Sequence, residues 1–419
     1  MKNGDVLVIG AGVAGIEASL LLAGAGRKVY LIEKTSYIGG NVIKYEHVFS
    51  NLECATCMVA PKQQELLANE NIVLLTLSEI LDVKGSSGNF VVKVGKKARY
   101  VDLINCIGCS ACFDPCPVSV KNEFEEGLSE RKAIYIPCNG TLPNVPAIDT
   151  KNCLRFTKGE DCQACKEACM FDAIDFDQSD EELELKVGAI LVATGFSQFD
   201  PAKTPQFGYG KIGDVYTAFE FERMFASNGP TGGEIKLRNG EHPKAVAIVH
   251  CVGRKEKGYC STVCCMYSLK FVHYLKEKLP EVKIYELYSD LCIPGKSYQK
   301  FYEETKEKGV QIIRAGEVSV TEEGRGIIIK STVNGKERSL SVDMVILSPA
   351  IEPREDAPRL AKVLDIPQDE HGFFREEPYA PVATPREGVF IAGCAQEPKD
   401  IQDSVAQSEA AVGRILATL

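Results

Sequence analysis

A chain of 419 residues exceeds the size at which one hydrophobic core keeps growing, so two or three domains are expected. The formal net charge of -10 argues against a nucleic-acid partner, whose phosphates require a basic surface, and against simple adsorption to an anionic membrane. The sequence has no recognisable secretion signal and no apolar run long enough to span a bilayer. We therefore expect a cytoplasmic protein in which the clustered cysteines, among 17 in all, are metal ligands or redox groups rather than disulfides.

Residues 5–33 read DVLVIGAGVAGIEASLLLAGAGRKVYLIE and carry the fingerprint of a dinucleotide site. An apolar strand leads into a glycine loop, a helix and a second strand that ends on an acid. Such glycines let the backbone approach a pyrophosphate at a helix N-terminus, and the acid is placed to accept from a ribose hydroxyl. The alternative is a glycine-rich structural turn. Since the following Gly-Gly-Asn resembles FAD sites rather than NAD sites, the expected FAD contacts here are Gly10, Gly12, Val13, Ala14, Gly15, Glu33, Lys34, Gly40 and Asn41.

Two later segments, VGAILVATGF (187–196) and GVFIAGCAQEPKD (388–400), resemble the later flavin-domain segments of flavoproteins with two dinucleotide-binding domains. In those proteins the last segment ends in Gly-Asp, and the aspartate holds the ribityl chain. Here it is Gly393-Cys394, which leaves FAD expected but its ribityl contact open. The further expected FAD contacts are Ala193, Thr194, Gly195, Gly393, Cys394, Lys399, Asp400 and Ile401.

A ferredoxin-like segment interrupts the flavin domain between residues 94 and 187. Its first motif is Cys106-x-x-Cys109-x-x-Cys112-x-x-x-Cys116-Pro117, the spacing of a bacterial [4Fe-4S] site. Its second motif is Cys153-x8-Cys162-x-x-Cys165-x-x-x-Cys169. In two-cluster ferredoxins the fourth cysteine of a motif serves the other cluster. The expected sets are Cys106, Cys109, Cys112 and Cys169 for one cluster, and Cys153, Cys162, Cys165 and Cys116 for the other; the alternative is one cluster with a decayed second site.

A second Rossmann-like alternation follows, with strands expected at 245–249, 282–287 and 310–314 and helices at 264–278 and 298–308. Its phosphate loop should be rich in glycine but carries only Gly253 and Gly258. The same loop holds four thiols at a strand end and a helix start, where thiol pKa values fall toward the ligating form. We expect a third [4Fe-4S] cluster on Cys251, Cys260, Cys264 and Cys265, with a zinc site or buried apolar cysteines as alternatives.

The expected fold is therefore α/β, with two Rossmann-like domains arranged as in thioredoxin reductase and an inserted two-cluster ferredoxin domain. The expected boundaries are 1–99, 183–240 and 351–419 for the three parts of the FAD-binding domain, 100–182 for the insert and 241–350 for the second Rossmann-like domain.

The chain as a whole resembles the A subunit of heterodisulfide reductase and its relatives in the quinone-interacting oxidoreductases of sulfate reducers. The matching stretches include LECATCMVAPK (52–62), the first ferredoxin motif, CSTVCCMYS (260–268) and GCAQEPKDIQDSVAQ (393–407). The resemblance implies an oxidoreductase with FAD and several [4Fe-4S] clusters, including an unusual one at the four second-domain cysteines. It also implies that Lys399 lies near the isoalloxazine, where a lysine would stabilise the anionic reduced flavin. An ordinary solvated lysine is the alternative.

The resemblance further implies a multi-subunit cytoplasmic complex of anaerobes that relays or bifurcates electrons. Its implied partners are B and C type subunits, with a hydrogenase, a formate dehydrogenase or ferredoxin as further candidates, and homodimerisation within the complex. Long family members carry an N-terminal extension and a C-terminal ferredoxin domain, so we expect any ferredoxin branch to lie in another polypeptide or to be missing. A non-enzymatic alternative is an electron-storage or scaffold subunit. It would differ from the oxidoreductase chiefly in that its flavin does not turn over with a small molecule.

The Cys54-Ala-Thr-Cys57 motif leaves three readings open: a catalytic dithiol, ligands lent to a shared cluster, or simple packing. The first gives the runner-up function, an NAD(P)H-dependent flavoprotein disulfide reductase. The missing nucleotide fingerprint and the lack of a histidine after His371 argue against it. The remaining residues Cys138, Cys292 and Cys394 are expected to be structural, and His250 and His273 to be satisfied side chains.

Overall fold

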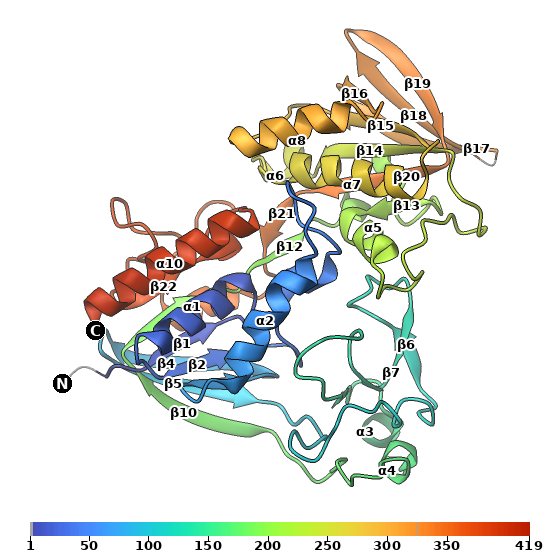
Figure 1. Cartoon of the computed structure of the whole chain (residues 1–419). Coiled ribbons are helices and arrows are strands. Elements are labelled where there is room, and N and C mark those ends of the chain that lie inside the picture. The colour runs from blue at the N-terminus through green and yellow to red at the C-terminus, as the bar shows by residue number, and fades with distance from the viewer. Residues whose placement is uncertain (1–2, 325) are drawn as a thin grey trace. The chain divides into compact units, whose positions relative to one another are not determined.

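The computed structural model describes residues 3–324 and 326–419, which fall into two compact units (Figure 1). The first unit comprises Met1–Ile43, Met58–Gly195 and Pro353–Leu419; the second comprises Lys44–Cys57 and Phe196–Glu352. The expected flavin-domain segment 183–240 is thus divided near residue 195. The reason is that β13 (Val215–Thr217) pairs with β20 (Met344–Pro349) in the main sheet of the second unit.

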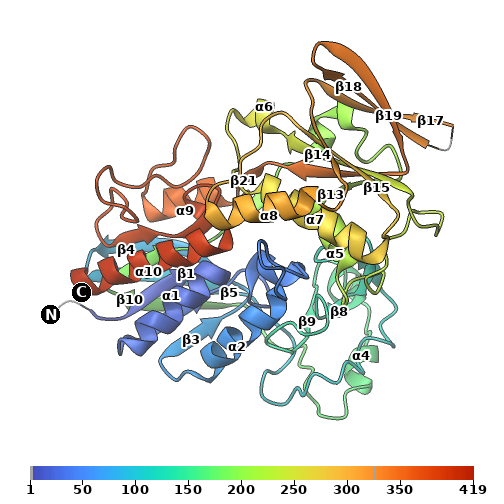
Figure 2. The ribbon, with the colours of Figure 1, turned by 45° about the horizontal axis from the view of Figure 1, so that its top comes forward.

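A five-stranded parallel sheet forms the centre of the first unit. Its order is β22 (Val389–Ile391), β11 (Ala189–Val192), β1 (Val6–Ile9), β2 (Val29–Ile32) and β3 (Ile72–Leu75). Most of these Val, Ile and Leu side chains are buried, as in parallel strands that are covered on both faces. Helices α1 (Val13–Gly24) and α10 (Ile401–Thr418) lie side by side (Figures 1 and 2), where the Ser408 hydroxyl donates to the Ala14 carbonyl.

A three-stranded antiparallel sheet packs in the same core. Its order is β10 (Glu181–Val187), β5 (Asn89–Lys96) and β4 (Ser78–Ser86), and α9 (Ala357–Leu364) joins its apolar face. Residues 97–180 are inserted between the paired ends of β5 and β10, where Lys96 lies opposite Glu181. The insert therefore leaves and re-enters the unit at one place.

The insert has little regular structure. Its elements are β6 (Ser119–Lys121), β7 (Glu130–Lys132), β8 (Ile134–Tyr135), β9 (Ala147–Ile148), α3 (Leu154–Lys158) and α4 (Ala164–Glu167). Its small core mixes apolar side chains with the cysteines of both motifs. A core of this size has few apolar side chains to bury.

The second unit is built on another five-stranded parallel sheet. Its order is β13, β20, β14 (Ala245–Val252), β15 (Lys283–Tyr288) and β16 (Gln311–Arg314). Helix α7 (Cys264–Lys278) coincides with the expected helix, and α8 (Lys296–Lys306) begins two residues before it was expected. A three-stranded antiparallel sheet of β17 (Val318–Glu323), β18 (Gly326–Val333) and β19 (Lys336–Val342) adds to the core. Strand and helix alternation thus follows the expected Rossmann-like pattern.

Helix α5 (Ala218–Phe225) shows how local chemistry sets a boundary. The Thr217 hydroxyl accepts from the Glu220 amide, and the Glu220 carboxylate accepts from the Thr217 amide, which completes a capping box. The remaining elements are η1 (Gly40–Lys44), α2 (Ala55–Ala68), β12 (Phe196–Gln198), η2 (Pro201–Lys203), η3 (Pro205–Phe207), α6 (Arg254–Lys257), β21 (Ile351–Pro353) and η4 (Gly393–Ala395).

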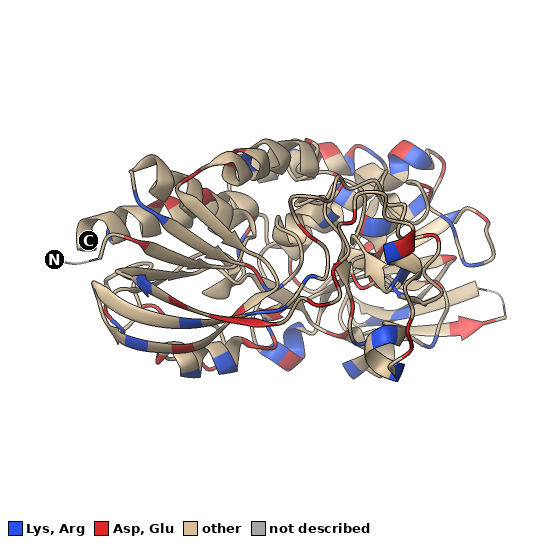
Figure 3. Cartoon of the chain, turned by 90° about the horizontal axis from the view of Figure 1, so that it is seen from below, with Lys and Arg blue, Asp and Glu red and all other residues tan. Residues whose placement is uncertain are grey.

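Charged residues of both signs alternate along the chain. Figure 3 shows Lys and Arg interspersed with Asp and Glu, and pairs such as Lys93 with Glu182 join neighbouring strands. Within the described residues, no helix combines the length and the apolar character needed to cross a bilayer.

Candidate functional site

Close backbone contacts shape the glycine loop after β1. A Cβ at Gly10 would lie 2.4 Å from the carbonyl oxygen of Ala193, and one at Gly15 would lie 1.8 Å from the carbonyl oxygen of Gly10. The packing of the unit itself therefore requires glycine at both positions. A Cβ at Gly12 would meet only the Cα of Gly40, at 3.9 Å. Since no side chain caps α1 at Gly12, this open part of the loop fits the phosphates of a dinucleotide.

The acid at the end of β2 is tied to the same loop. The Glu33 carboxylate accepts from the Ala11 amide at 2.9 Å and from the Thr35 amide at 2.8 Å. Each carboxylate oxygen can accept more than one hydrogen bond, so a ribose contact from Glu33 is compatible with these bonds. Lys34 forms an ion pair with Asp356 at 2.8 Å, so its ammonium already has a partner within the chain.

The third segment places a thiol where related flavoproteins have an aspartate. The Gly393 amide donates to Gln407 Oε1 at 2.7 Å, and the Cys394 thiol donates to the Lys399 carbonyl at 3.3 Å. Burial raises the pKa of Cys394 to about 11, so this side chain is uncharged at neutral pH. Cys394 therefore cannot replace the charge of an aspartate.

Lys399 is held between two acceptors. Its Nζ donates to Gln396 Oε1 and to Glu397 Oε1, both at 2.6 Å, and its side chain is only 10% exposed. The next residue, Asp400, accepts from the Asp403 amide and caps α10, which begins at Ile401. The alternative of an ordinary solvated lysine therefore does not hold.

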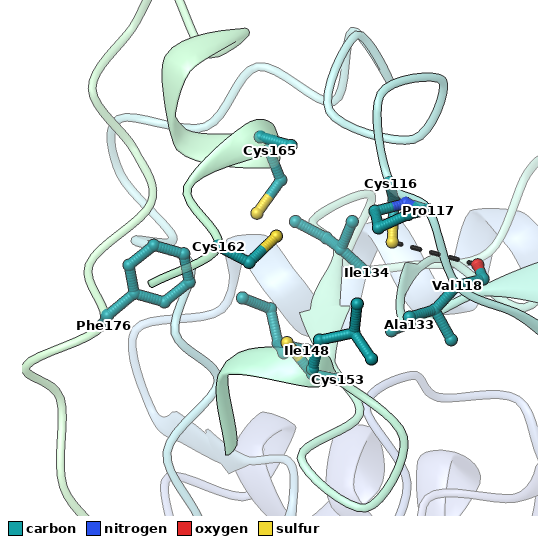
Figure 4. A pocket seen from close by; sticks show the side chains of 12 residues that line it. Cys116, Pro117, Val118, Ala133, Ile134, Ile148, Cys153, Cys162, Cys165 and Phe176 are labelled. Carbon is teal, nitrogen blue, oxygen red and sulfur yellow. Dashed lines mark hydrogen bonds between the residues drawn. The ribbon is translucent and has the colours of Figure 1, made fainter. Parts of the chain in front are cut away.

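Four cysteines of the insert surround one cavity, which is partly open to solvent. They are Cys116, Cys153, Cys162 and Cys165, and Figure 4 shows their sulfur atoms on its walls. One belongs to the first motif and three to the second, so the two motifs meet here. The rest of the lining is apolar, apart from the backbone, and includes Ile134, Ile148 and Phe176. A lining of thiols and apolar groups suits an iron-sulfur cluster.

Four further cysteines of the insert, Cys106, Cys109, Cys112 and Cys169, also influence one another. Burial raises the pKa of Cys106, and the neighbouring thiols of Cys169 and Cys109 raise it further. Burial likewise raises the pKa of Cys112 to about 12, with smaller contributions from Cys165, Cys106 and Cys169. Because Cys165 lies on the wall of the cavity, the two sets of four cysteines are neighbours.

Buried thiols bind iron only after they lose their protons. Burial raises the pKa of Cys165 to about 11 and also raises that of Cys153. Iron binding must therefore displace protons here, and its affinity falls as the pH falls. Among the described residues, no three or more His, Cys, Asp or Glu side chains are arranged to hold a metal ion.

Arg99 joins the insert to the loop that follows β2. Its guanidinium is buried and donates to the carbonyls of Ser36 and Val145, at 2.7 and 2.8 Å, and to the Thr76 hydroxyl at 2.8 Å. Burial lowers the pKa of Arg99 to about 10, which leaves it charged at neutral pH. One buried cation thus connects the glycine-loop side of the unit with the cysteine-rich insert.

We expect Arg99→Met to destabilise the first unit by about 2 kcal/mol, because several buried acceptors lose their donor. The insert should also become more sensitive to limited proteolysis. Thermal unfolding and protease digestion of the loaded protein measure both effects. Arg99→Lys should recover part of the loss, since a lysine can satisfy some of the acceptors; equal stability of Arg99→Met and the wild type would contradict the role given to Arg99.

The second unit gathers its cysteines between β14 and α7. Cys251 lies in β14 with φ +60°, Cys260 follows α6, and Cys264 and Cys265 are the first residues of α7. The Cys264 thiol donates to the Cys265 sulfur, and this bond is the largest cause that lowers the pKa of Cys265 to about 4. The pKa of Cys264 is raised in consequence. The contact between Cys264 and Cys265 therefore lowers the pKa of one thiol at the start of α7, the direction that metal ligation requires.

The glycines of this loop serve the backbone instead of a nucleotide. Gly253 and Gly258 have φ values of +83° and +80° and flank α6. A Cβ at Gly253 would lie 2.5 Å from the ring of Phe199. Both glycines are thus explained by the local fold.

A buried acid and histidine lie beside these cysteines. His250 and Glu286 are almost completely buried, and none of the two ring nitrogens and two carboxylate oxygens has a hydrogen-bond partner within the described chain. The expectation that His250 is satisfied holds only in part: its Nε2 lies 3.8 Å from a Glu286 carboxylate oxygen, an ion pair when the ring is protonated, and its ring lowers the pKa of the neighbouring Cys265. His273 is satisfied as expected, since Nε2 pairs with the Thr305 hydroxyl at 3.0 Å.

The Cys54 and Cys57 sulfurs are joined in a disulfide, with their Cα atoms 5.3 Å apart. The segment that carries them is anchored within the second unit, where Lys270 Nζ donates to the His47 carbonyl at 2.9 Å and forms a buried pair with Glu222. The sequence left three interpretations open for Cys54 and Cys57: a catalytic dithiol, ligands of a shared cluster, or simple packing. The disulfide fits the first, a dithiol that can be oxidised.

Comparison with models of known protein families identifies the family of the chain. The profile described as Pyridine nucleotide-disulphide oxidoreductase matches residues 4–408. The chain belongs to this family. Two solved structures share the family fold: T. acidophilum thioredoxin reductase (TM-score 0.53, 13% identity, 100% of this chain and 99% of that chain) and LpdA of Mycobacterium tuberculosis (TM-score 0.56, 15% identity, 99% and 72%). The expected thioredoxin-reductase-like α/β fold is thereby confirmed.

Within this family, the chain is similar to the A subunits of heterodisulfide reductases, which confirms the resemblance seen in its motifs. It is 41% identical to the iron-sulfur A subunit of the CoB--CoM heterodisulfide reductase of Methanocaldococcus jannaschii, over 98% of this chain and 63% of the relative. It is 40% identical to the A subunit of the H(2):CoB-CoM heterodisulfide,ferredoxin reductase of Methanothermobacter marburgensis, over 97% and 63%. The chain thus spans slightly less than two thirds of the length of these relatives.

Two features of this family member, Arg99 and Glu286, lay outside the sequence predictions, and two others, His250 and Cys292, were predicted in different roles. The expectation that Cys292 is structural was incomplete, because its backbone amide donates to the Cys265 sulfur at 3.4 Å. One signal could have found it: Cys251 and Cys292 lie at or just beyond the ends of two neighbouring parallel strands, and such ends meet at one edge of a sheet.

Proposed function

We propose that the chain is the electron-transfer component of a heterodisulfide-reductase-like complex, and that it moves electrons between FAD and three [4Fe-4S] clusters. The observation that carries this proposal is the meeting of cysteines from two separate motifs around one cavity, in the same unit as the glycine loop. When bound, the flavin would exchange electrons in pairs or singly, and the clusters would carry them singly.

The FAD would be held by three segments of the first unit. The open backbone at Gly12 would face its pyrophosphate, and Glu33 its ribose. Gly195, with φ +72°, and the start of α10 would supply the other backbone contacts. Because Cys394 is a neutral thiol, the ribityl chain would be held without the usual carboxylate.

The three clusters would be held by three sets of cysteines. In the insert, the sets are Cys106, Cys109, Cys112 and Cys169, and Cys116, Cys153, Cys162 and Cys165. In the second unit, the set is Cys251, Cys260, Cys264 and Cys265. The second-unit set occupies the connection where an NAD(P)H-dependent reductase needs a phosphate loop, and this argues against the runner-up function.

The complex would contain B and C type subunits and function in the cytoplasm of an anaerobe. A hydrogenase, a formate dehydrogenase or ferredoxin would be a further partner, and the chain would form a homodimer within the complex. The name of the Methanothermobacter relative joins a heterodisulfide and ferredoxin as two electron acceptors, which supports flavin-based bifurcation as the finer form of the proposal. If the complex does not reduce ferredoxin, and if the flavin couple has no low-potential step, the proposal of flavin-based bifurcation is wrong.

Quantitation after anaerobic purification tests the cofactors. We expect about twelve irons, an equal amount of acid-labile sulfide and one FAD per chain. A chain that binds zinc, or only about four irons, would contradict the three-cluster assignment.

We expect Lys399→Met to lower the midpoint potential of the bound flavin by on the order of 50 mV, because a buried cation would no longer stabilise the reduced anion. Lys399→Arg keeps the charge and should keep most of the potential. A spectroelectrochemical titration measures the shift, with FAD content as the control for binding. An unchanged potential in Lys399→Met, at full FAD content, would show that the ammonium does not act on the ring.

A further inference from the structure

Half of the exposed large apolar side chains among the described residues lie in two short stretches of the insert. Five of ten such side chains belong to residues 103–107 and 170–171. They are Leu103, Ile104, Ile107, Met170 and Phe171, and we call them the apolar patch. Ile104 and Met170 are the most exposed of the five, at 91% and 86%. A group of exposed apolar side chains commonly marks a contact surface.

The backbone holds the two stretches side by side. Val101 and Ile174 form an antiparallel bridge, and the Asp102 amide donates to the Ala173 carbonyl at 2.7 Å. In an antiparallel pair, the stretch that follows Asp102 lies beside the stretch that precedes Ala173. The two parts of the apolar patch are therefore neighbours in space as well as in composition.

The same stretches carry cysteines of one proposed cluster. The Cys106 amide donates to the Asp102 carbonyl at 3.2 Å, and the Asp172 amide donates to the Cys169 carbonyl at 3.3 Å, so both stretches are held in turns. A patch residue directly follows each of these two cysteines in the sequence. Cys109, a further member of the set, is itself exposed. The apolar patch therefore adjoins the place where this cluster would come nearest to the surface.

Acidic side chains accompany the patch. Residues 102–115 and 167–175 contain five carboxylates and no lysine or arginine. The five are Asp102, Asp114, Glu167, Asp172 and Asp175; all except Asp102 are exposed, and none forms an ion pair with another described residue. A contact face ringed by lysine and arginine would complement these charges.

On the basis of the proposed function, we propose that the apolar patch is the docking surface of a one-electron carrier protein whose own apolar contact face is ringed by lysine and arginine. Apolar contact would hold the two surfaces together. The carboxylates would steer the approach of the carrier, and this steering would weaken as salt is added. The cluster held by Cys106, Cys109, Cys112 and Cys169 would be the one that exchanges electrons with the carrier.

Mitochondrial cytochrome c serves as the probe, because it is a basic protein that accepts one electron. The loaded chain is purified anaerobically, reduced and freed of reductant, and stopped-flow absorbance gives the second-order rate constant of haem reduction. We expect Ile104→Ser/Met170→Ser to lower this rate constant about tenfold, since two apolar side chains leave the interface. Leu21→Ser, which changes an exposed apolar side chain of α1, is the control and should react like the wild type.

A second pair of variants tests the charges. Asp172→Asn/Asp175→Asn should react several-fold more slowly than the wild type at low ionic strength and should depend less on salt. Asp172 has φ +46°, a conformation that asparagine also adopts, so the change should leave the turn intact. Glu65→Gln/Glu70→Gln removes two exposed carboxylates outside the insert and should keep the wild-type rate constant.

Three outcomes would overturn the inference and leave the proposed function standing. A wild-type rate constant in Ile104→Ser/Met170→Ser would show that the carrier does not use the patch. Faster electron transfer to an acidic ferredoxin than to cytochrome c, with a rate that rises with salt, would show that the partner has the opposite charge. A wild-type dimer that Ile104→Ser/Met170→Ser loses would show that a second copy of the chain occupies the patch.

Failure of the proposed function would give a different result. Each variant is first assayed for iron and for reduction of duroquinone, a small neutral acceptor that needs no docking surface, and both values should equal those of the wild type. A wild-type chain that holds no iron, or that reduces no acceptor at all, would contradict the proposed function itself. If Ile104→Ser/Met170→Ser loses iron, the single change Ile104→Thr gives the same readout.

Discussion

Replacing Cys116 by alanine should remove one of three clusters, so that the iron content falls from about twelve to about eight per FAD. Cys116 is the last cysteine of the first motif in sequence but lies on the cavity formed with Cys153, Cys162 and Cys165. The double variant Cys116→Ala/Cys165→Ala should therefore still contain about eight irons, because both changes affect one cluster. Cys116→Ala/Cys112→Ala should contain about four, because the changes affect two.

Iron and acid-labile sulfide assays on anaerobically purified protein decide between these arrangements. If each cluster were held by consecutive cysteines of one motif, the two double variants would exchange their values. Cys138→Ala, a cysteine outside the three proposed sets, serves as the control and should keep the full iron content.

Gly12→Ala should weaken flavin binding and leave the fold intact. Gly12 has φ -80° and ψ -173°, which any residue adopts, and its added methyl would meet protein only at 3.9 Å. The methyl would instead occupy the space into which the pyrophosphate fits, so we expect at least a tenfold loss of FAD affinity, about 1.4 kcal/mol. Fluorescence titration of FAD into the deflavinated chain measures this loss.

Gly15→Ala should act differently, because its methyl would lie 1.8 Å from the Gly10 carbonyl oxygen and force the backbone to move. We expect the first unit to lose about 1–3 kcal/mol or more of stability, measured as a lower urea midpoint. Gly24→Ala, in the last residue of α1 and without a neighbouring atom within 4 Å, is the matched control and should be neutral or slightly stabilising.

Normal FAD affinity in Gly12→Ala would contradict the assignment of this loop to the flavin.

Patterns of short range explain which features the sequence could predict. The apolar periodicity of Val263, Met266, Phe271 and Leu275 predicts a helix where α7 lies, and the glycine spacing predicts the strand, loop and helix at the N-terminus. Strand β13 is only three residues long and has no hydrophobic pattern that marks it as a strand of the second unit. The sequence therefore predicts a flavin-domain segment that extends past residue 195, where the structure ends it.

Contacts between distant parts of the chain explain the rest. Arg99 is one basic residue in a sequence with 48 lysines and arginines, and only the fold shows that it is buried among carbonyls from two regions. Cys292 is 27 residues from Cys265, and its role depends on how a loop folds over the edge of a sheet. Spacing within a motif carries no information about either.

The single point at which the insert joins its sheet has a consequence for the origin of this protein. Because Lys96 and Glu181 are paired neighbours, a short turn between them would restore an ordinary β-hairpin. An ancestral flavoprotein could thus have acquired the cysteine-rich module by lengthening one hairpin loop, at a modest cost in chain entropy and without a change in strand order. The same junction offers a place to excise the module, or to graft it onto another flavoprotein of this family.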